Sequence, residues 1–181
     1  MKKTIILITT MIVVFLSACK KDIAIDKNRF VEGKIQFTLN NDVTLKKTFN
    51  DLKSIIGDKE YVLRNFYYTK VIQPDSMTYY WHLFKNCSYI TVFNVFKRPN
   101  DFFTQFNAFN FNNLDYFNYS KWDSIVNAEK LIEMPNGGDN VFRAGYLFVP
   151  NGQELIWINK LKELAIVKDA NYVFKYYAGP M

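Results

Sequence analysis

Few residues of this chain carry the side chains on which catalysis or metal binding depends. His82 is the only histidine, and Cys19 and Cys87 are the only cysteines. A zinc site takes four ligands from cysteine, histidine and carboxylate side chains, and calcium-binding and phosphate-binding loops have characteristic spacings that do not occur here. We therefore predict neither a metal site nor a cofactor.

The acidic residues considered for general acid and base roles are Asp115, Asp123, Glu129 and Glu133. Glu129 and Glu133 are four positions apart, a spacing that places both on one helix face if a helix extends that far. A glycosidase needs two carboxyl groups at a defined separation across a cleft, and the sequence does not supply that separation. No catalytic residue is assigned.

Aromatic side chains are numerous, with 17 Phe, 12 Tyr and 3 Trp, and they concentrate in residues 66–68, 79–81 and 102–122. A genome rich in A and T would explain this composition, because the codons for Phe, Tyr, Asn, Ile and Lys are rich in these bases. In that case the aromatic rings are expected to fill the core. The alternative is that some rings are exposed and contact a sugar, a peptide or a partner protein. The candidates for such binding are Tyr67, Tyr80, Trp81 and Trp122.

The amino terminus has the features of a secretion signal. Lys2 and Lys3 are followed by an apolar stretch over residues 5–16, which is shorter than the roughly 20 residues of a membrane-spanning helix. The motif Leu16-Ser17-Ala18-Cys19 resembles a lipobox, the signature of bacterial lipoproteins. The resemblance covers about a tenth of the chain, and no family is recognised for the remainder.

The lipobox resemblance implies that residues 1–18 are removed and that Cys19 receives a diacylglyceryl group and further acylation, for example with palmitate. Two or three acyl chains hold a protein firmly at a membrane, whereas one chain binds only reversibly. Lys20 stands where an aspartate would indicate retention in the inner membrane. The expected location is therefore the extracytoplasmic side of a bacterial membrane, with the outer membrane favoured and the cell surface as the alternative.

Residues 19–29 are expected to form the lipidated cysteine and a polar tether, and residues 30–181 a single domain. Without Lys2 and Lys3 the chain has 21 basic and 17 acidic residues. This modest excess is scattered, and the protein is expected outside the cytoplasm, so no nucleic-acid partner is predicted. Once Cys19 is lipidated, Cys87 has no intramolecular partner. We interpret it as a buried free thiol, although an intermolecular bridge and a reactive thiol stay open as alternatives, and we do not pair it with His82.

The hydrophobic pattern predicts an α+β fold: a mainly antiparallel sheet of about six or seven strands with three or four packed helices. Leu45, Phe49, Leu52 and Ile56 recur at helical spacing, and Ile35, Phe37 and Leu39 alternate as in a half-buried strand. The further predicted strands are residues 61–72, 77–85, 89–97, 141–149, 153–158 and 172–177. The further predicted helices lie near residues 102–109, 120–133 and 161–167. The strongest predicted turn is Asn151-Gly152, as a hairpin.

Three functions are compatible with these features. The anchor, the small domain, the aromatic surplus and the missing catalytic constellation favour a non-catalytic binding or assembly module, with an envelope protein or a glycan as its partner. The first alternative is an inhibitor or immunity-type lipoprotein that neutralises a toxin or hydrolase. The second is an envelope hydrolase that acts on glycans.

Overall fold

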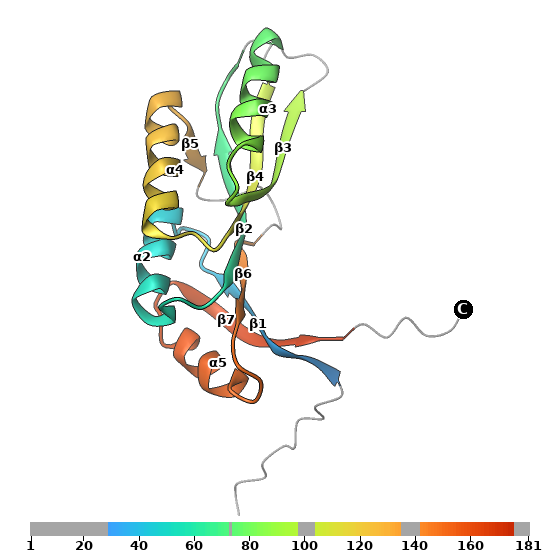
Figure 1. Cartoon of the computed structure of the whole chain (residues 1–181), viewed down its shortest axis with the longest axis vertical. Coiled ribbons are helices and arrows are strands. Elements are labelled where there is room, and N and C mark those ends of the chain that lie inside the picture. Colours follow the sequence, from blue (N-terminus) through green and yellow to red (C-terminus); the bar gives the residue numbers. More distant parts are fainter. Residues whose placement is uncertain (1–28, 73, 98–103, 135–141, 176–181) are drawn as a thin grey trace, which may run out of the picture.

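The computed structural model describes residues 29–72, 74–97, 104–134 and 142–175. Within these residues, four helices pack on a seven-stranded antiparallel sheet (Figure 1), which confirms the predicted α+β class. The elements in chain order are β1 (Phe30–Leu39), α2 (Leu45–Ile56), β2 (Tyr61–Thr69), the short 3-10 helix η2 (Pro74–Ser76), α3 (Met77–Lys85), β3 (Ile90–Lys97), β4 (Thr104–Asn112), α4 (Tyr116–Glu129), β5 (Ile132–Met134), β6 (Ala144–Phe148), α5 (Glu154–Lys162) and β7 (Val167–Phe174). Cys19, the signal segment and most of the tether lie outside the described residues.

The strands lie in the order β3-β4-β2-β6-β1-β7, and β5 pairs with β2. Tyr67 of β2 pairs with Ala108 of β4 and also with Met134 of β5, so β5 lies on the side of β2 that faces away from β4. β6 occupies the same side farther along, where Arg64 pairs with Ala144. β5 and β6 therefore follow one another along β2, and residues 135–143 connect them.

The helices cover one face of the sheet, and the core lies between the two layers. Phe84 of α3 and Trp122 of α4 both contact Phe109 of β4, with ring centroids 5.0 and 5.1 Å apart. The predicted helix over residues 45–56 is confirmed as α2, which begins after Thr44 and ends at Gly57. Phe49 of α2 stacks on Tyr119 of α4 with a centroid distance of 4.5 Å. Among the described residues, none of the helices is sufficiently long and apolar to cross a membrane.

Two aromatic segments adopt the structure opposite to the prediction. Residues 77–85 form helix α3 rather than a strand, because Tyr80 and Phe84 are four residues apart and are both buried on one helix face. Residues 102–109 were expected to be a helix, but β4 begins at Thr104. Phe109 and Phe111 are two residues apart and buried, which is the period of a strand.

The predicted hairpin around Asn151-Gly152 is also wrong. Gly152 does adopt a positive φ of 84°, but helix α5 follows the turn instead of a strand. Trp157, Ile158 and Leu161 form the buried face of this helix, so the expected cross-strand pairs with β6 do not form. The helix expected over residues 161–167 is replaced by the end of α5 and the start of β7.

The helix predicted to begin at Ser120 begins earlier. Asp115 caps it, with its Oδ1 accepting a hydrogen bond of 2.6 Å from the N–H of Asn118. The helix ends at Glu129, where Lys130 takes a φ of 53°. Ile132, which was expected in the same helix, is the first residue of β5.

Candidate functional site

The candidate site lies on the face of the sheet that the described helices leave open. In β1, Ile35, Phe37 and Leu39 are buried toward the helices, so the residues between them belong to the opposite face. The same alternation in β2, β6 and β7 brings polar and aromatic side chains to this face. The residues concerned are Lys34, Gln36, Thr38, Arg64, Tyr146, Phe148, Asp169 and Asn171.

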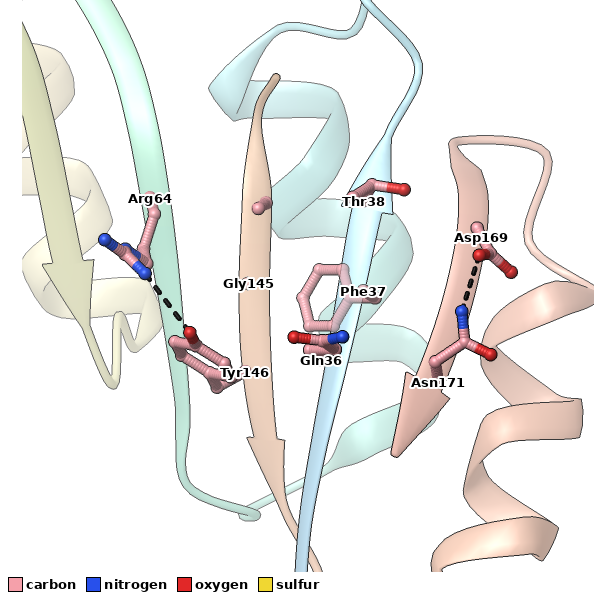
Figure 2. A pocket seen from close by; sticks show the side chains of 9 residues that line it. Gln36, Phe37, Thr38, Arg64, Gly145, Tyr146, Asp169 and Asn171 are labelled. Atoms are coloured by element: carbon pink, nitrogen blue, oxygen red, sulfur yellow. Dashed lines mark hydrogen bonds between the residues drawn. The ribbon is translucent and has the colours of Figure 1, made fainter. Parts of the chain in front are cut away.

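A hollow of about 190 Å³ crosses β2, β6, β1 and β7 on the open face (Figure 2). Arg64 and Tyr146 border it at one end, and Asp169 and Asn171 border it at the other. Pockets that enclose small molecules usually measure about 300–1,000 Å³. This hollow is therefore suited to one side chain of a larger partner rather than to a whole small molecule.

Gly145 allows the strands under the hollow to approach closely. A Cβ atom at this position would collide with Cζ of Phe37 and would lie 2.7 Å from the carbonyl oxygen of Val62. Because Gly145 has no side chain, the ring of Phe37, its partner on β1, lies against the backbone of β6. Glycine is thus required here by close packing of an aromatic ring on a neighbouring strand.

A β-bulge fixes the position of Arg64. Asn65 has a φ of 64°, and the register of β2 with β4 shifts between Leu63 and Phe66. The extra residue leaves both Leu63 and Phe66 buried toward the helices and Arg64 on the open face. The side chain of Asn65 secures the bulge by donating a hydrogen bond of 2.9 Å to the carbonyl oxygen of Phe142.

Two cations flank Tyr146. The Nζ atom of Lys34 lies 4.1 Å from the centre of the Tyr146 ring, and Nη1 of Arg64 donates a hydrogen bond of 3.2 Å to its hydroxyl oxygen. Lys34 also lies 5.4 Å from the ring centre of Phe148. Neither cation has a carboxylate partner within the described residues. The aromatic rings compensate part of the positive charge, and an incoming anionic group would compensate the rest.

The far end of the hollow holds a paired carboxylate, and its middle is neutral. Asp169 accepts hydrogen bonds from the side chain of Asn171 at 2.6 Å and from the N–H of Ala170 at 2.9 Å, and it pairs with Nζ of Lys162 at 3.5 Å. The side chains of Gln36 and Thr38 have no hydrogen-bond partner among the described residues, so they can bond to a ligand. The arrangement presents a cation, two neutral polar groups and a carboxylate in a row across four strands.

The lining of the hollow offers polar, cationic and aromatic contacts to a ligand. Asp169 is the only carboxylate in the lining, which contains neither cysteine nor histidine, so it lacks a paired acid and base. Within the described parts of the chain, no cluster of three or more histidine, cysteine or acidic side chains could hold a metal ion.

The four aromatic residues named from the sequence do not form one surface. Trp122 is only 1 % exposed, because it packs among Tyr68, Phe84, Phe109 and Phe111. Tyr80 is buried too, and its hydroxyl donates to Glu129 at 2.8 Å. Tyr67 is half-buried on β2, and Trp81 is 43 % exposed on α3. Two of the four rings therefore belong to the core.

The four acids considered for catalysis have separate partners. Asp115 caps α4, and Asp123 accepts a hydrogen bond of 3.3 Å from the side chain of Asn127 on the same helix. Glu129 accepts hydrogen bonds from Tyr79 and Tyr80 and pairs with Lys70 at 3.0 Å. None of these acids lines the hollow on the open face.

Glu133 forms a largely buried ion pair with Arg143, with Oε1 and Nη2 3.1 Å apart. Its carboxylate also accepts hydrogen bonds from the N–H of Leu45 at 2.7 Å and from the hydroxyl of Tyr68 at 3.2 Å. Burial raises the pKa of Glu133 and lowers the pKa of Arg143. Desolvation therefore outweighs the mutual attraction of the two groups. All three partners of Glu133 belong to the fold, which gives the carboxylate a structural role.

Cys87 is a free, half-buried thiol that donates to the carbonyl oxygen of Leu83 at 3.4 Å. His82 is exposed on α3.

Sequence reasoning did not single out Lys34, Arg64 or Tyr146. Each comes from a different strand, and β6 is inserted between β1 and β2, far from both in sequence. The alternation of Ala144, Tyr146 and Phe148 was a usable signal for the strand, but the predicted hairpin paired this strand with residues 153–158 instead of with β1 and β2. Comparison with protein-family models, with characterised proteins and with solved structures finds no match for this chain.

Proposed function

We propose that this chain is a lipid-anchored, non-catalytic binding module on the extracytoplasmic side of a bacterial membrane, and that it binds a protein partner through the open face of its sheet. The observation that carries the proposal is the pair of cations, Lys34 and Arg64, which contact Tyr146 without a carboxylate partner in the described structure. An acidic side chain of the partner would complete the site.

The size of the site favours a polypeptide. Neighbouring strands lie about 4.8 Å apart, so the row from Arg64 on β2 to Asp169 on β7 spans about 14 Å, or roughly four residues of an extended chain. Gln36 and Thr38 in the middle could bond to the main chain of such a segment. Asp169 at the far end already pairs with Lys162 at 3.5 Å. The expected partner segment therefore carries an acidic residue at the end that meets Lys34 and Arg64.

The anchor is part of the proposal. Acylation of Cys19 would hold the domain at the membrane, and residues 19–29 would let it move up to about 35 Å from the surface when fully extended. Feeding labelled palmitate to cells that express the chain tests this part. We expect the label in the native chain but not in Cys19→Ala. An unlabelled native chain would contradict the anchor without affecting the site on the sheet.

The binding site is tested by photocrosslinking in intact cells. A photoreactive amino acid at Thr38 lies in the hollow, and one at the exposed Leu155 on α5 serves as the control. We expect one major adduct from position 38 that depends on the charges of Lys34 and Arg64. The crosslinked peptide of the partner should contain Asp or Glu. Equal adducts from both positions, or a lipid adduct from position 38, would contradict the proposal.

A further inference from the structure

Strand β5 places apolar side chains on the open face of the sheet, beside the cationic end of the hollow. Glu133 of β5 faces the helical layer, where its carboxylate bonds to α2 and to the hydroxyl of Tyr68. Side chains alternate along a strand, so Ile132 and Met134, on either side of Glu133, belong to the open face. Tyr67 of β2 lies opposite Met134 and shares this face, because opposite residues of an antiparallel pair lie on the same side.

Phe142 adds a fourth apolar side chain. It precedes the buried Arg143, which faces the helical layer, so its ring belongs to the open face. Its carbonyl oxygen accepts the hydrogen bond from Asn65, the residue after Arg64. Nζ of Lys168 lies 4.7 Å from the centre of its ring. The four apolar residues on this part of the open face, here called the apolar patch, are Tyr67, Ile132, Met134 and Phe142.

The apolar patch is exposed and has cations at its edge. The exposed fraction is 64 % for Ile132, 46 % for Phe142 and 38 % for Met134. Within the described residues, neither Arg64 nor Lys168 has a carboxylate partner. Single exposed aliphatic residues are ordinary, whereas adjacent exposed apolar residues with a polar rim are typical of protein interaction sites.

The patch continues the contact that starts at Arg64. From Arg64 to Thr69, which lies opposite Ile132, β2 rises about 15 Å, so the patch is as long as the hollow is wide. Apolar contact at the patch would exclude water from the neighbouring guanidinium group of Arg64. A charged pair is stronger where water is excluded, so the two contacts would support each other.

We infer that the apolar patch is the second half of the contact with the protein partner, and that apolar side chains of the partner lie next to its acidic residue. The inference rests on the proposed function, because it names a further feature of the partner that the open face would bind. It distinguishes a partner surface that is both acidic and apolar from a purely acidic segment, which Lys34 and Arg64 alone would attract.

Photocrosslinking from two positions tests the inference in cells that express the full chain. With p-benzoylphenylalanine in place of Ile132, the adduct should contain the same protein as the adduct from position 38, and the crosslinked peptide should contain apolar residues. Ile132→Thr with Met134→Gln nearly keeps the size of both side chains but makes them polar. This pair of substitutions should lower the yield of the adduct from position 38 by about fivefold or more.

Leu155→Gln with Ile156→Thr is the matched control, because these residues of α5 are 54 and 56 % exposed. The control should keep the native yield. The inference is overturned, and the proposed function stands, if position 38 gives its charge-dependent adduct but position 132 does not capture the same protein. It is also overturned if the patch variant keeps the native yield or loses no more than the control. If position 38 captures no protein, the proposed function and the inference both fail.

Discussion

Replacing Arg143 by methionine tests how the sheet is held together between β5 and β6. Arg143 is 2 % exposed, and its Nη2 atom donates to the carbonyl oxygen of Met134 at 2.6 Å while it pairs with Glu133. The guanidinium carbon also lies 4.9 Å from the ring centre of Phe66. Arg143 thus links the end of β5 to the residue that precedes β6 and to the core.

The expected loss of stability follows from the charge that remains. Arg143→Met leaves the carboxyl group of Glu133 largely buried, with only the N–H of Leu45 and the hydroxyl of Tyr68 as partners. Breaking a buried ion pair by removing one partner costs about 3–5 kcal/mol. Glu133→Gln keeps the size of the side chain but leaves the charge of Arg143 uncompensated, so its loss should be similar, about 3 kcal/mol.

The double variant distinguishes a coupled pair from two independent residues. Nε and Nη1 of Arg143 have no hydrogen-bond partner within the described structure, so the native pair is incompletely satisfied. The double variant, Arg143→Met with Glu133→Gln, removes both charges, so its free energy of unfolding should match that of either single variant. The loss would then be about 3 kcal/mol smaller than the sum of the two single losses, and this difference is the coupling energy of the pair. Urea unfolding followed by the fluorescence of the buried Trp122 and Trp157 measures all four proteins. Losses that add to within about 0.5 kcal/mol would refute the reasoning.

Three further predictions concern the remaining parts of the fold. Gly145→Ala should destabilise the protein by about 2 kcal/mol in urea unfolding, because the added Cβ would collide with the ring of Phe37. Combining it with Phe37→Leu should recover part of this loss. If nothing is recovered, the steric explanation is wrong. Burial opposes ionisation of Glu129, but hydrogen bonds from Tyr80, Tyr79 and Lys70 outweigh it and hold its pKa below the ordinary value. This group therefore stabilises the fold above pH 4.5 and loses its contribution as pH falls through the lowered pKa. The melting temperature of Glu129→Gln should therefore depend less on pH in that acidic range than the melting temperature of the native protein. An identical pH profile would disprove the contribution. The raised pKa of Glu133 has the opposite effect on stability, but this effect is the same in both proteins and cancels in the comparison. Asp115→Ala should cost about 1 kcal/mol in urea unfolding through loss of the helix cap, whereas Asp123→Ala on the same helix should cost little; equal losses would argue against capping.

The sequence predicted the elements whose burial follows a single period. Helix α2 was found because Leu45, Phe49, Leu52 and Ile56 form one apolar stripe between lysines. Helix α3 and strand β4 were exchanged because their rings are compatible with either period, and packing against Trp122 decides between them. The turn at Gly152 was found, but its conformation does not determine whether a strand or a helix follows.

The candidate site was beyond sequence reasoning for a topological reason. Lys34, Arg64 and Tyr146 meet only because β6 enters the sheet between β1 and β2. The bulge at Asn65 determines the side of the sheet on which Arg64 lies. It depends on the positive φ of Asn65, which no local sequence motif predicts. The abundance of aromatic residues is evident from the sequence. Their burial is not, and Trp122 and Tyr80, which were candidates for binding, belong to the core.

The most direct test of the proposed function measures the affinity of the crosslinked partner for charge-reversed variants. Lys34→Glu with Arg64→Glu should weaken binding at least tenfold, and the native affinity should fall as salt is raised. The control is Lys46→Glu with Lys175→Glu, which changes the net charge equally at exposed positions away from the hollow. We expect this control to bind nearly as the native protein does. An equal loss in both pairs would show that overall charge, and not the site around Tyr146, attracts the partner.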